Sequence, residues 1–143
     1  MGFAEKDYVG ILARFFNQAN RVGLVSAYLF GSQSTGKTHR ESDVDVGVLL
    51  GWRTHPTRQE RFEERLKLSS DLIAALGTNE VDVVILNDTP PPLAARIVTE
   101  GKQLFCAEPL LDREFFRDVQ LRAADLLAFL SRTRRIKLLA LQR

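Results

Sequence analysis

Two aspartates in a strand-like run are the residues of this chain whose spacing most clearly suggests chemistry. Asp43 and Asp45 belong to the alternating segment Asp43–Leu50, in which the other face is apolar and consists of Val44, Val46, Val48 and Leu50. In a strand the two carboxylates would lie about 6.6 Å apart on one face, and we expect Gly47 to leave space beyond them. Carboxylates this close repel unless a cation lies between them, and hard oxygen ligands suit Mg²⁺.

A third carboxylate follows in a second strand-like segment, Glu80–Leu86. Asp82 lies near the start of this segment, on the face opposite Val81, Val83 and Ile85. If the two strands are neighbours, Asp82 joins Asp43 and Asp45. Three acids on adjacent strands are typical of two-metal sites, in which the ions bind the attacking and leaving oxygens of phosphoryl or nucleotidyl transfer.

The turn before the first aspartate strand fits two different nucleotide-binding patterns. Gly31–Thr38 matches the P-loop pattern, and the apolar segment Val25–Phe30 before it is β-prone. However, only His39–Ser42 separates Thr38 from the next strand, whereas a crossover helix needs about ten residues or more. We therefore reject the P-loop and interpret Lys37 and Thr38 as surface loop residues. A Gly-Ser turn that approaches phosphates remains, with backbone N–H groups and the Ser32 hydroxyl as donors.

The same residues resemble a known family signature. Gly31-Ser32, ten residues and then Asp43-x-Asp45 is similar to the signature of the DNA-polymerase-β superfamily of nucleotidyltransferases, and most closely to its minimal members. Asp82 matches the later strand carboxylate of the family, and the resemblance covers roughly residues 25–106. It implies that Gly31 and Ser32 hold the β- and γ-phosphates of ATP. It also implies that the three aspartates are catalytic and bind Mg²⁺, as two ions.

The resemblance also implies a function. Many minimal members are antitoxins that transfer AMP from ATP to a tyrosine of a HEPN-domain ribonuclease toxin, and we expect this chain to be such a Mg²⁺-dependent protein adenylyltransferase in a complex with its toxin. One departure is Ser34–Gly36, where many relatives have Ala-Arg-Gly, so that a cation is lost and Lys37 is a candidate substitute. Two alternatives stay open. One is an antitoxin that acts by binding alone, and the other is a nucleotidyltransferase acting on a small molecule such as an aminoglycoside.

Helical patterns surround these strands and predict an α/β fold with a small mixed sheet backed by helices. An amphipathic N-terminal helix is indicated by Tyr8, Ile11, Leu12, Phe15, Phe16 and Ala19. Thr57 and Glu60 form a capping box and Gly77 a stop, which predicts a crossover helix that joins the two aspartate strands in parallel, with Phe62, Leu66, Ile73 and Leu76 buried. A short helix from Pro90 to Gly101 and a last strand, Lys102–Cys106, should follow.

The composition changes after residue 108. We expect a nucleotidyltransferase domain over 1–108 and a helical extension over 109–143 that docks on a partner, starting at Asp112 as a cap. Its end, Arg132–Arg143, interleaves arginines and a lysine with leucines and holds no acid, which suits either a solvated terminus or an acidic partner groove.

Composition narrows the class of protein further. The net charge of +2 does not indicate direct nucleic-acid binding, and a single cysteine excludes an internal disulfide. His39 and His55 have no partner at metal-binding spacing, so zinc is not expected. No apolar run is long enough to span a membrane, and we expect a soluble cytoplasmic protein.

Overall fold

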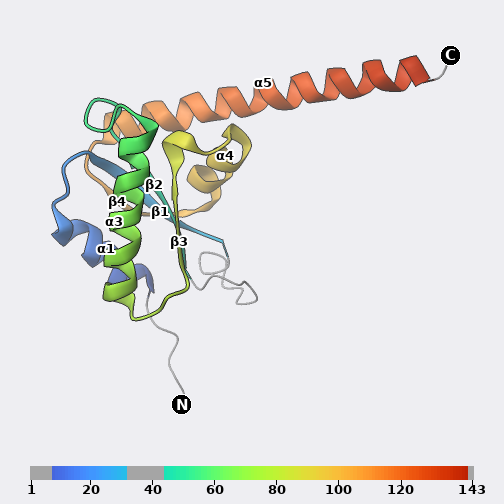
Figure 1. The fold of residues 1–143 in the computed structure, drawn as a ribbon. Coiled ribbons are helices and arrows are strands. Elements are labelled where there is room, and N and C mark those ends of the chain that lie inside the picture. Colours follow the sequence, from blue (N-terminus) through green and yellow to red (C-terminus); the bar gives the residue numbers. More distant parts are fainter. Residues whose placement is uncertain (1–7, 32–43, 142–143) are drawn as a thin grey trace.

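The computed structural model describes residues 8–31 and 44–141, and its centre is a four-stranded sheet. Figure 1 shows the arrangement of the helices around it. The strands are β1 (Leu24–Phe30), β2 (Val44–Leu50), β3 (Val81–Ile85) and β4 (Lys102–Cys106), in the spatial order β3-β2-β1-β4. β1 is antiparallel to both β2 and β4, whereas β2 and β3 are parallel. The mixed sheet expected from the sequence is confirmed.

One face of the sheet is covered by α1 (Tyr8–Ala19) and α3 (Arg58–Leu76). Leu12 and Phe16 of α1 and the leucines of α3 bury this face together with the alternating valines of β2. The N-terminal helix is therefore confirmed. The period of two in β2 is what places its valines in this layer.

The crossover helix α3 begins and ends where the sequence predicts. The Thr57 hydroxyl accepts the backbone N–H of Glu60 at 3.1 Å, and Gly77 ends the helix in the left-handed conformation at φ 72. The predicted buried stripe is partly wrong, because Phe62 and Leu66 are 46% and 54% exposed. The residues of α3 that are buried are Arg61, Leu68, Leu72 and Leu76.

The opposite face is covered by α4 (Pro91–Glu100) and by the first part of α5 (Pro109–Leu141). A short 3-10 turn, η1 (Leu86–Asp88), joins β3 to α4. Ile97 and Ala94 of α4 and Val119 and Ala123 of α5 form the second core layer. The predicted short helix and last strand are both confirmed.

The C-terminal segment is one continuous helix that extends well beyond the rest of the molecule (Figure 1). The sequence suggested Asp112 as the cap of this helix, and that prediction is wrong. The helix α5 already begins at Pro109, and Asp112 lies in its first turn. The Asp112 carboxylate instead accepts the Tyr28 hydroxyl at 2.5 Å and the Gln103 amide at 3.0 Å. These bonds fix the start of α5 on β1 and β4.

None of the helices in the described parts of the chain combines the length and the hydropathy that a membrane span requires.

Candidate active site

Asp45 and Gly47 lie on the α4 face of β2, opposite the valines, as the period of two predicts. The expectation that Gly47 leaves free space is wrong. A Cβ at Gly47 would lie 3.0 Å from Ile97 Cγ2 and 3.2 Å from Leu86 Cδ2, so these side chains pack directly on the glycine. The glycine therefore lets α4 approach the sheet, and the packed apolar side chains bound the site on this side of Asp45.

Asp45 and Asp82 are direct partners in the parallel pairing of β2 and β3. The predicted neighbourhood of the two aspartate strands is thus confirmed, and paired residues of adjacent strands project from the same face of a sheet. Their environments differ. Asp45 is only 3% exposed, whereas the side chain of Asp82 is 49% exposed. Because β3 is an edge strand, the pair forms an acidic site that opens at the edge of the sheet.

Gly31 lies against the same carboxylate. It follows the last residue of β1, Phe30, which pairs with Asp45, and its φ is 79. A Cβ at Gly31 would overlap the Oδ2 atom of Asp45. The backbone conformation therefore favours glycine, and any larger residue would have to displace the Asp45 carboxylate. The structure brings Gly31 and Asp45 together, as the Gly-Ser and Asp-x-Asp spacing suggests.

Ser32, Asp43, Lys37 and Thr38 lie outside the described residues. The segment that contains them connects Gly31, which lies against the Asp45 carboxylate, to Val44, the chain neighbour of Asp45. β1 and β2, on either side of this segment, are antiparallel neighbours, which is not the parallel arrangement of a P-loop strand and its successor. Within residues 8–31 and 44–141, no group of three potential metal ligands is found.

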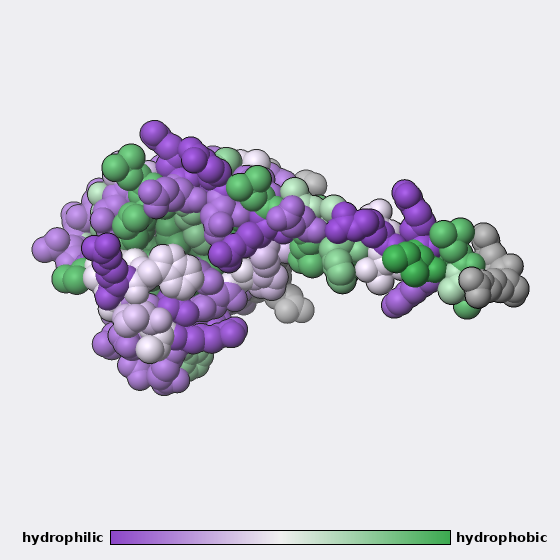
Figure 2. Space-filling view, turned by 90° about the horizontal axis from the view of Figure 1, so that it is seen from above, coloured by the Kyte–Doolittle hydropathy of each residue, from purple (hydrophilic) through white to green (hydrophobic). Residues whose placement is uncertain are grey.

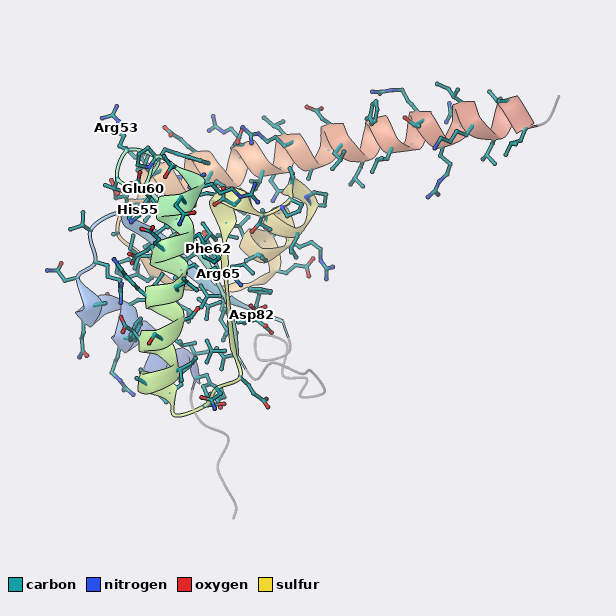
Figure 3. All side chains as sticks on the ribbon, in the orientation of Figure 1. Arg53, His55, Glu60, Phe62, Arg65 and Asp82 are labelled. Atoms are coloured by element: carbon teal, nitrogen blue, oxygen red, sulfur yellow. The ribbon has the colours of Figure 1, made fainter. Side chains whose placement is uncertain are left out.

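Arg65 is a residue near this site that the sequence interpretation missed. Its Nε–H donates to the backbone oxygen of Val83 at 2.7 Å, and its Nη2 lies 3.9 Å from Oδ1 of Asp82. Figure 3 shows the two side chains next to each other, one from α3 and one from β3. The signal was present in the sequence, because Arg61 and Arg65 precede Leu68, Leu72 and Leu76 at helical spacing on one face.

A cavity of about 1190 Å³ lies elsewhere, at the opposite end of β2. It is bounded by Leu49, by Trp52 in the loop after β2 and by residues from Pro109 to Arg122 of α5. Trp52 is 53% exposed there, and the Arg61 guanidinium carbon lies 4.9 Å from the centre of its ring. Trp52 therefore lies at the end of β2 and does not enter the core. Asp45 and Asp82 do not line this cavity.

Comparisons with known proteins place the chain among nucleotidyltransferases. The family model described as "Polymerase beta, Nucleotidyltransferase" matches residues 12–110. The protein adenylyltransferase MntA of Shewanella oneidensis is 40% identical over 78 residues, which are 54% of this chain and 51% of that protein. The chain thus spans about half the length of this curated relative.

Two solved structures extend the similarity over nearly the whole fold. A toxin–antitoxin crystal structure with AMP-PNP contains a chain that is 29% identical, with a TM-score of 0.67, covering 91% of this chain and 96% of the other. A tri-AMPylated HEPN toxin of Shewanella oneidensis in complex with its MNT antitoxin contains a chain that is 26% identical, with a TM-score of 0.63, covering 90% and 96%.

Proposed function

Because this chain belongs to the polymerase beta nucleotidyltransferase family, we propose that it is a protein adenylyltransferase that transfers AMP from ATP to a hydroxyl of a HEPN-type toxin. The observation that carries the proposal is the pairing of Asp45 with Asp82 beside Gly31. The similarity to MntA, and to antitoxins whose structures include AMP-PNP or an AMPylated toxin, supports the same substrate and partner. A tyrosine hydroxyl is the proposed acceptor.

The donor set fits Mg²⁺. Asp45 and Asp82 offer hard carboxylate oxygens on paired residues, Asp43 adds a third carboxylate next to Val44, and two like charges at neighbouring positions favour a cation between them. These three aspartates would hold the metal, as two ions. When bound, Mg²⁺ would neutralise the triphosphate and polarise the phosphorus that is attacked.

The other roles belong to the protein itself. The left-handed turn at Gly31 allows the backbone to approach phosphate oxygens, and the Ser32 hydroxyl would add a donor for the β- and γ-phosphates. Asp82, as the more exposed carboxylate, would accept a hydrogen bond from the acceptor hydroxyl and orient it for in-line attack. The buried Asp45 would keep a fixed orientation. In-line attack on the α-phosphorus would then release pyrophosphate.

We propose that residues 109–143 dock the partner. The helix face that packs on α4 through Val119 and Ala123 continues past the domain as Leu127 and Leu130, which are 59% and 51% exposed. Figure 2 shows apolar side chains interleaved with charged ones along the projecting helix. Four cations follow between residues 132 and 137, at Arg132, Arg134, Arg135 and Lys137, and residues 132–143 contain no acid. An acidic, partly apolar surface on the toxin would complement this segment.

The test is a transfer of label. The protein is incubated with ATP labelled at the α-phosphate, Mg²⁺ and the toxin, taken as the product of the neighbouring gene, and compared with the Asp43→Asn plus Asp45→Asn variant. We expect label on the toxin only with the unaltered protein. If the toxin stays unlabelled while both proteins bind it equally, transfer is excluded and neutralisation by binding alone is supported.

A further inference from the structure

The inner face of α3 carries two arginines where apolar residues would be expected. Leu68, Leu72 and Leu76 are buried at intervals of four residues, and Arg61 and Arg65 continue the same face toward the start of the helix.

The burial of Arg61 is explained by its hydrogen-bond partners. Arg61 is 6% exposed, and two of its nitrogens donate to the Asp88 carboxylate at 2.9 Å each, while Nη1 donates to the backbone oxygen of His55 at 2.8 Å. Arg65 has a different arrangement.

Arg65 extends toward the exposed edge strand β3 and is held at one point. The bond from Nε to the Val83 oxygen is 2.7 Å, so the base of the guanidinium is fixed on the backbone of β3. The distance from Nη2 to the Asp82 carboxylate is 3.9 Å, which is too long for a hydrogen bond but well within range of a charge interaction. Asp82 therefore has beside it a positive charge that is tied to the backbone of β3 and makes no hydrogen bond to the carboxylate at this distance (Figure 3).

We propose that Arg65 is a positioning residue that holds the Asp82 carboxylate opposite Asp45 and offsets their mutual repulsion until a divalent cation arrives. This inference depends on the proposed function, in which these carboxylates bind the cation. The charge has two opposite effects. The positive charge of Arg65 weakens the repulsion between Asp45 and Asp82 when no metal is bound. The same charge repels an incoming cation. Arg65 should therefore lower cation affinity while raising the rate of transfer.

The sign of this trade-off distinguishes positioning from a merely structural contact. Arg65→Gln keeps an N–H donor for the Val83 oxygen and removes the charge. Arg65→Lys keeps the charge and removes the planar fork. Lys67→Gln removes a charge from an exposed position of the same helix and serves as the matched control. A structural contact alone predicts equal or weaker cation binding in both Arg65 variants.

The first measurement is a titration of the full chain with Mn²⁺, followed by electron paramagnetic resonance, because it needs no transfer activity. We expect Arg65→Gln to bind Mn²⁺ about three- to tenfold more tightly, since a unit charge beside the site acts at a few ångströms in a partly screened environment. Arg65→Lys and Lys67→Gln should match the unaltered protein within about twofold.

The second measurement is the transfer rate at saturating metal and ATP. We expect kcat to fall about tenfold or more in Arg65→Gln and to recover partly in Arg65→Lys, because orientation of the acceptor depends on Asp82. Equal or weaker Mn²⁺ binding by Arg65→Gln overturns the inference, and so does a loss of thermal stability in both variants with unchanged binding. The proposed function fails separately, if Mn²⁺ binds in an Asp45-dependent way but no label reaches the toxin. If no Asp45-dependent binding occurs, both proposals fall.

Discussion

Asp45 and Asp82 face the same side of the sheet from directly paired positions on two parallel strands, yet one is buried and the other open to solvent. The buried carboxylate of Asp45, at the start of β2, lies against Gly31. The exposed carboxylate of Asp82 lies near Arg65. In the proposed function, the buried Asp45 anchors a cation and the exposed Asp82 meets the acceptor hydroxyl.

The proposed cation site predicts a stabilisation of the protein by Mg²⁺ and nucleotide that depends on Asp45. Mg²⁺ with a non-hydrolysable ATP analogue should raise the melting temperature of the protein by about 5–10 °C, since a ligand at a hundred times its Kd adds about 2.7 kcal/mol. Asp45→Asn should abolish most of this rise because it removes the buried ligand. Differential scanning fluorimetry measures it, and Asp125→Asn, an exposed acid of α5, is the control. An equal rise in Asp45→Asn would exclude Asp45 as a ligand.

Gly31→Ala should lower the free energy of unfolding more than the same change at an ordinary left-handed glycine. Gly77, at the end of α3, has a φ of 72 and Gly31 a φ of 79, so alanine costs about 1 kcal/mol at either site from the backbone alone. At Gly31 the added Cβ also overlaps the Asp45 carboxylate, and we expect a total loss of roughly 2–4 kcal/mol. Urea unfolding of the two variants compares these values. Similar losses at both glycines would show that the Asp45 contact relaxes freely.

The buried Tyr28 predicts a loss of stability at alkaline pH. Burial raises the pKa of Tyr28 above its ordinary value of 10.0, and the hydrogen bond to Asp112 raises it further. Because the folded pKa is higher, the contribution is fully present below pH 10 and is lost as the unfolded state ionises at higher pH. Tyr28→Phe should remove this alkaline slope.

The chain has only two tyrosines, so absorbance at the tyrosinate band separates them. Tyr8→Phe should leave one group whose ionisation coincides with alkaline unfolding, and it should retain the slope of stability with pH. If the slope persists in Tyr28→Phe, Tyr28 is not its source.

The Arg61 and Asp88 pair, which joins α3 to η1, should stabilise the protein strongly. Arg61 is 6% exposed and donates two hydrogen bonds to Asp88, so Asp88→Asn leaves a buried charge without its carboxylate. We expect a loss of about 3 kcal/mol, in line with broken buried pairs. Glu100→Gln, which removes the exposed pair with Arg96, should change stability by less than about 0.5 kcal/mol. Chemical denaturation of both variants checks the contrast, and equal effects would refute it.

The sequence predicted the elements that depend on local patterns. The alternation in β2 fixed the buried valines, and the capping box at Thr57 with the stop at Gly77 predicted α3 with little error, since these signals involve residues close in the chain. The length of that crossover in turn predicted the parallel pairing that brings Asp45 to Asp82. The expected metal-binding and phosphate-binding roles of Asp43, Asp45, Asp82, Gly31 and Ser32 remain predictions.

The errors arose where partners lie far apart in the chain. Phe62 and Leu66 were assigned to the buried face of α3 because they are apolar, but Asp88 and the Val83 carbonyl attract Arg61 and Arg65 to that face instead. The prediction that Asp112 is a cap was wrong because its main partner is Tyr28, which is 84 residues away in the chain. In each case a polar side chain lies where it can bind a partner that is distant in the chain. The periodicity of apolar residues does not predict such partners.

The projecting part of α5 should matter for partner binding and not for stability. A chain that ends at Ser131 loses the basic end with Ile136, Leu138, Leu139 and Leu141, which are at least 54% exposed, while the buried Val119 and Ala123 stay. We expect the free energy of unfolding to change by less than about 0.5 kcal/mol and toxin affinity to fall about tenfold or more, most strongly at low salt. Calorimetric titration with the toxin at two salt concentrations measures this. Phe62→Ser, which removes an exposed apolar side chain from α3, is the control, and undiminished binding by the shortened chain would place the interface elsewhere.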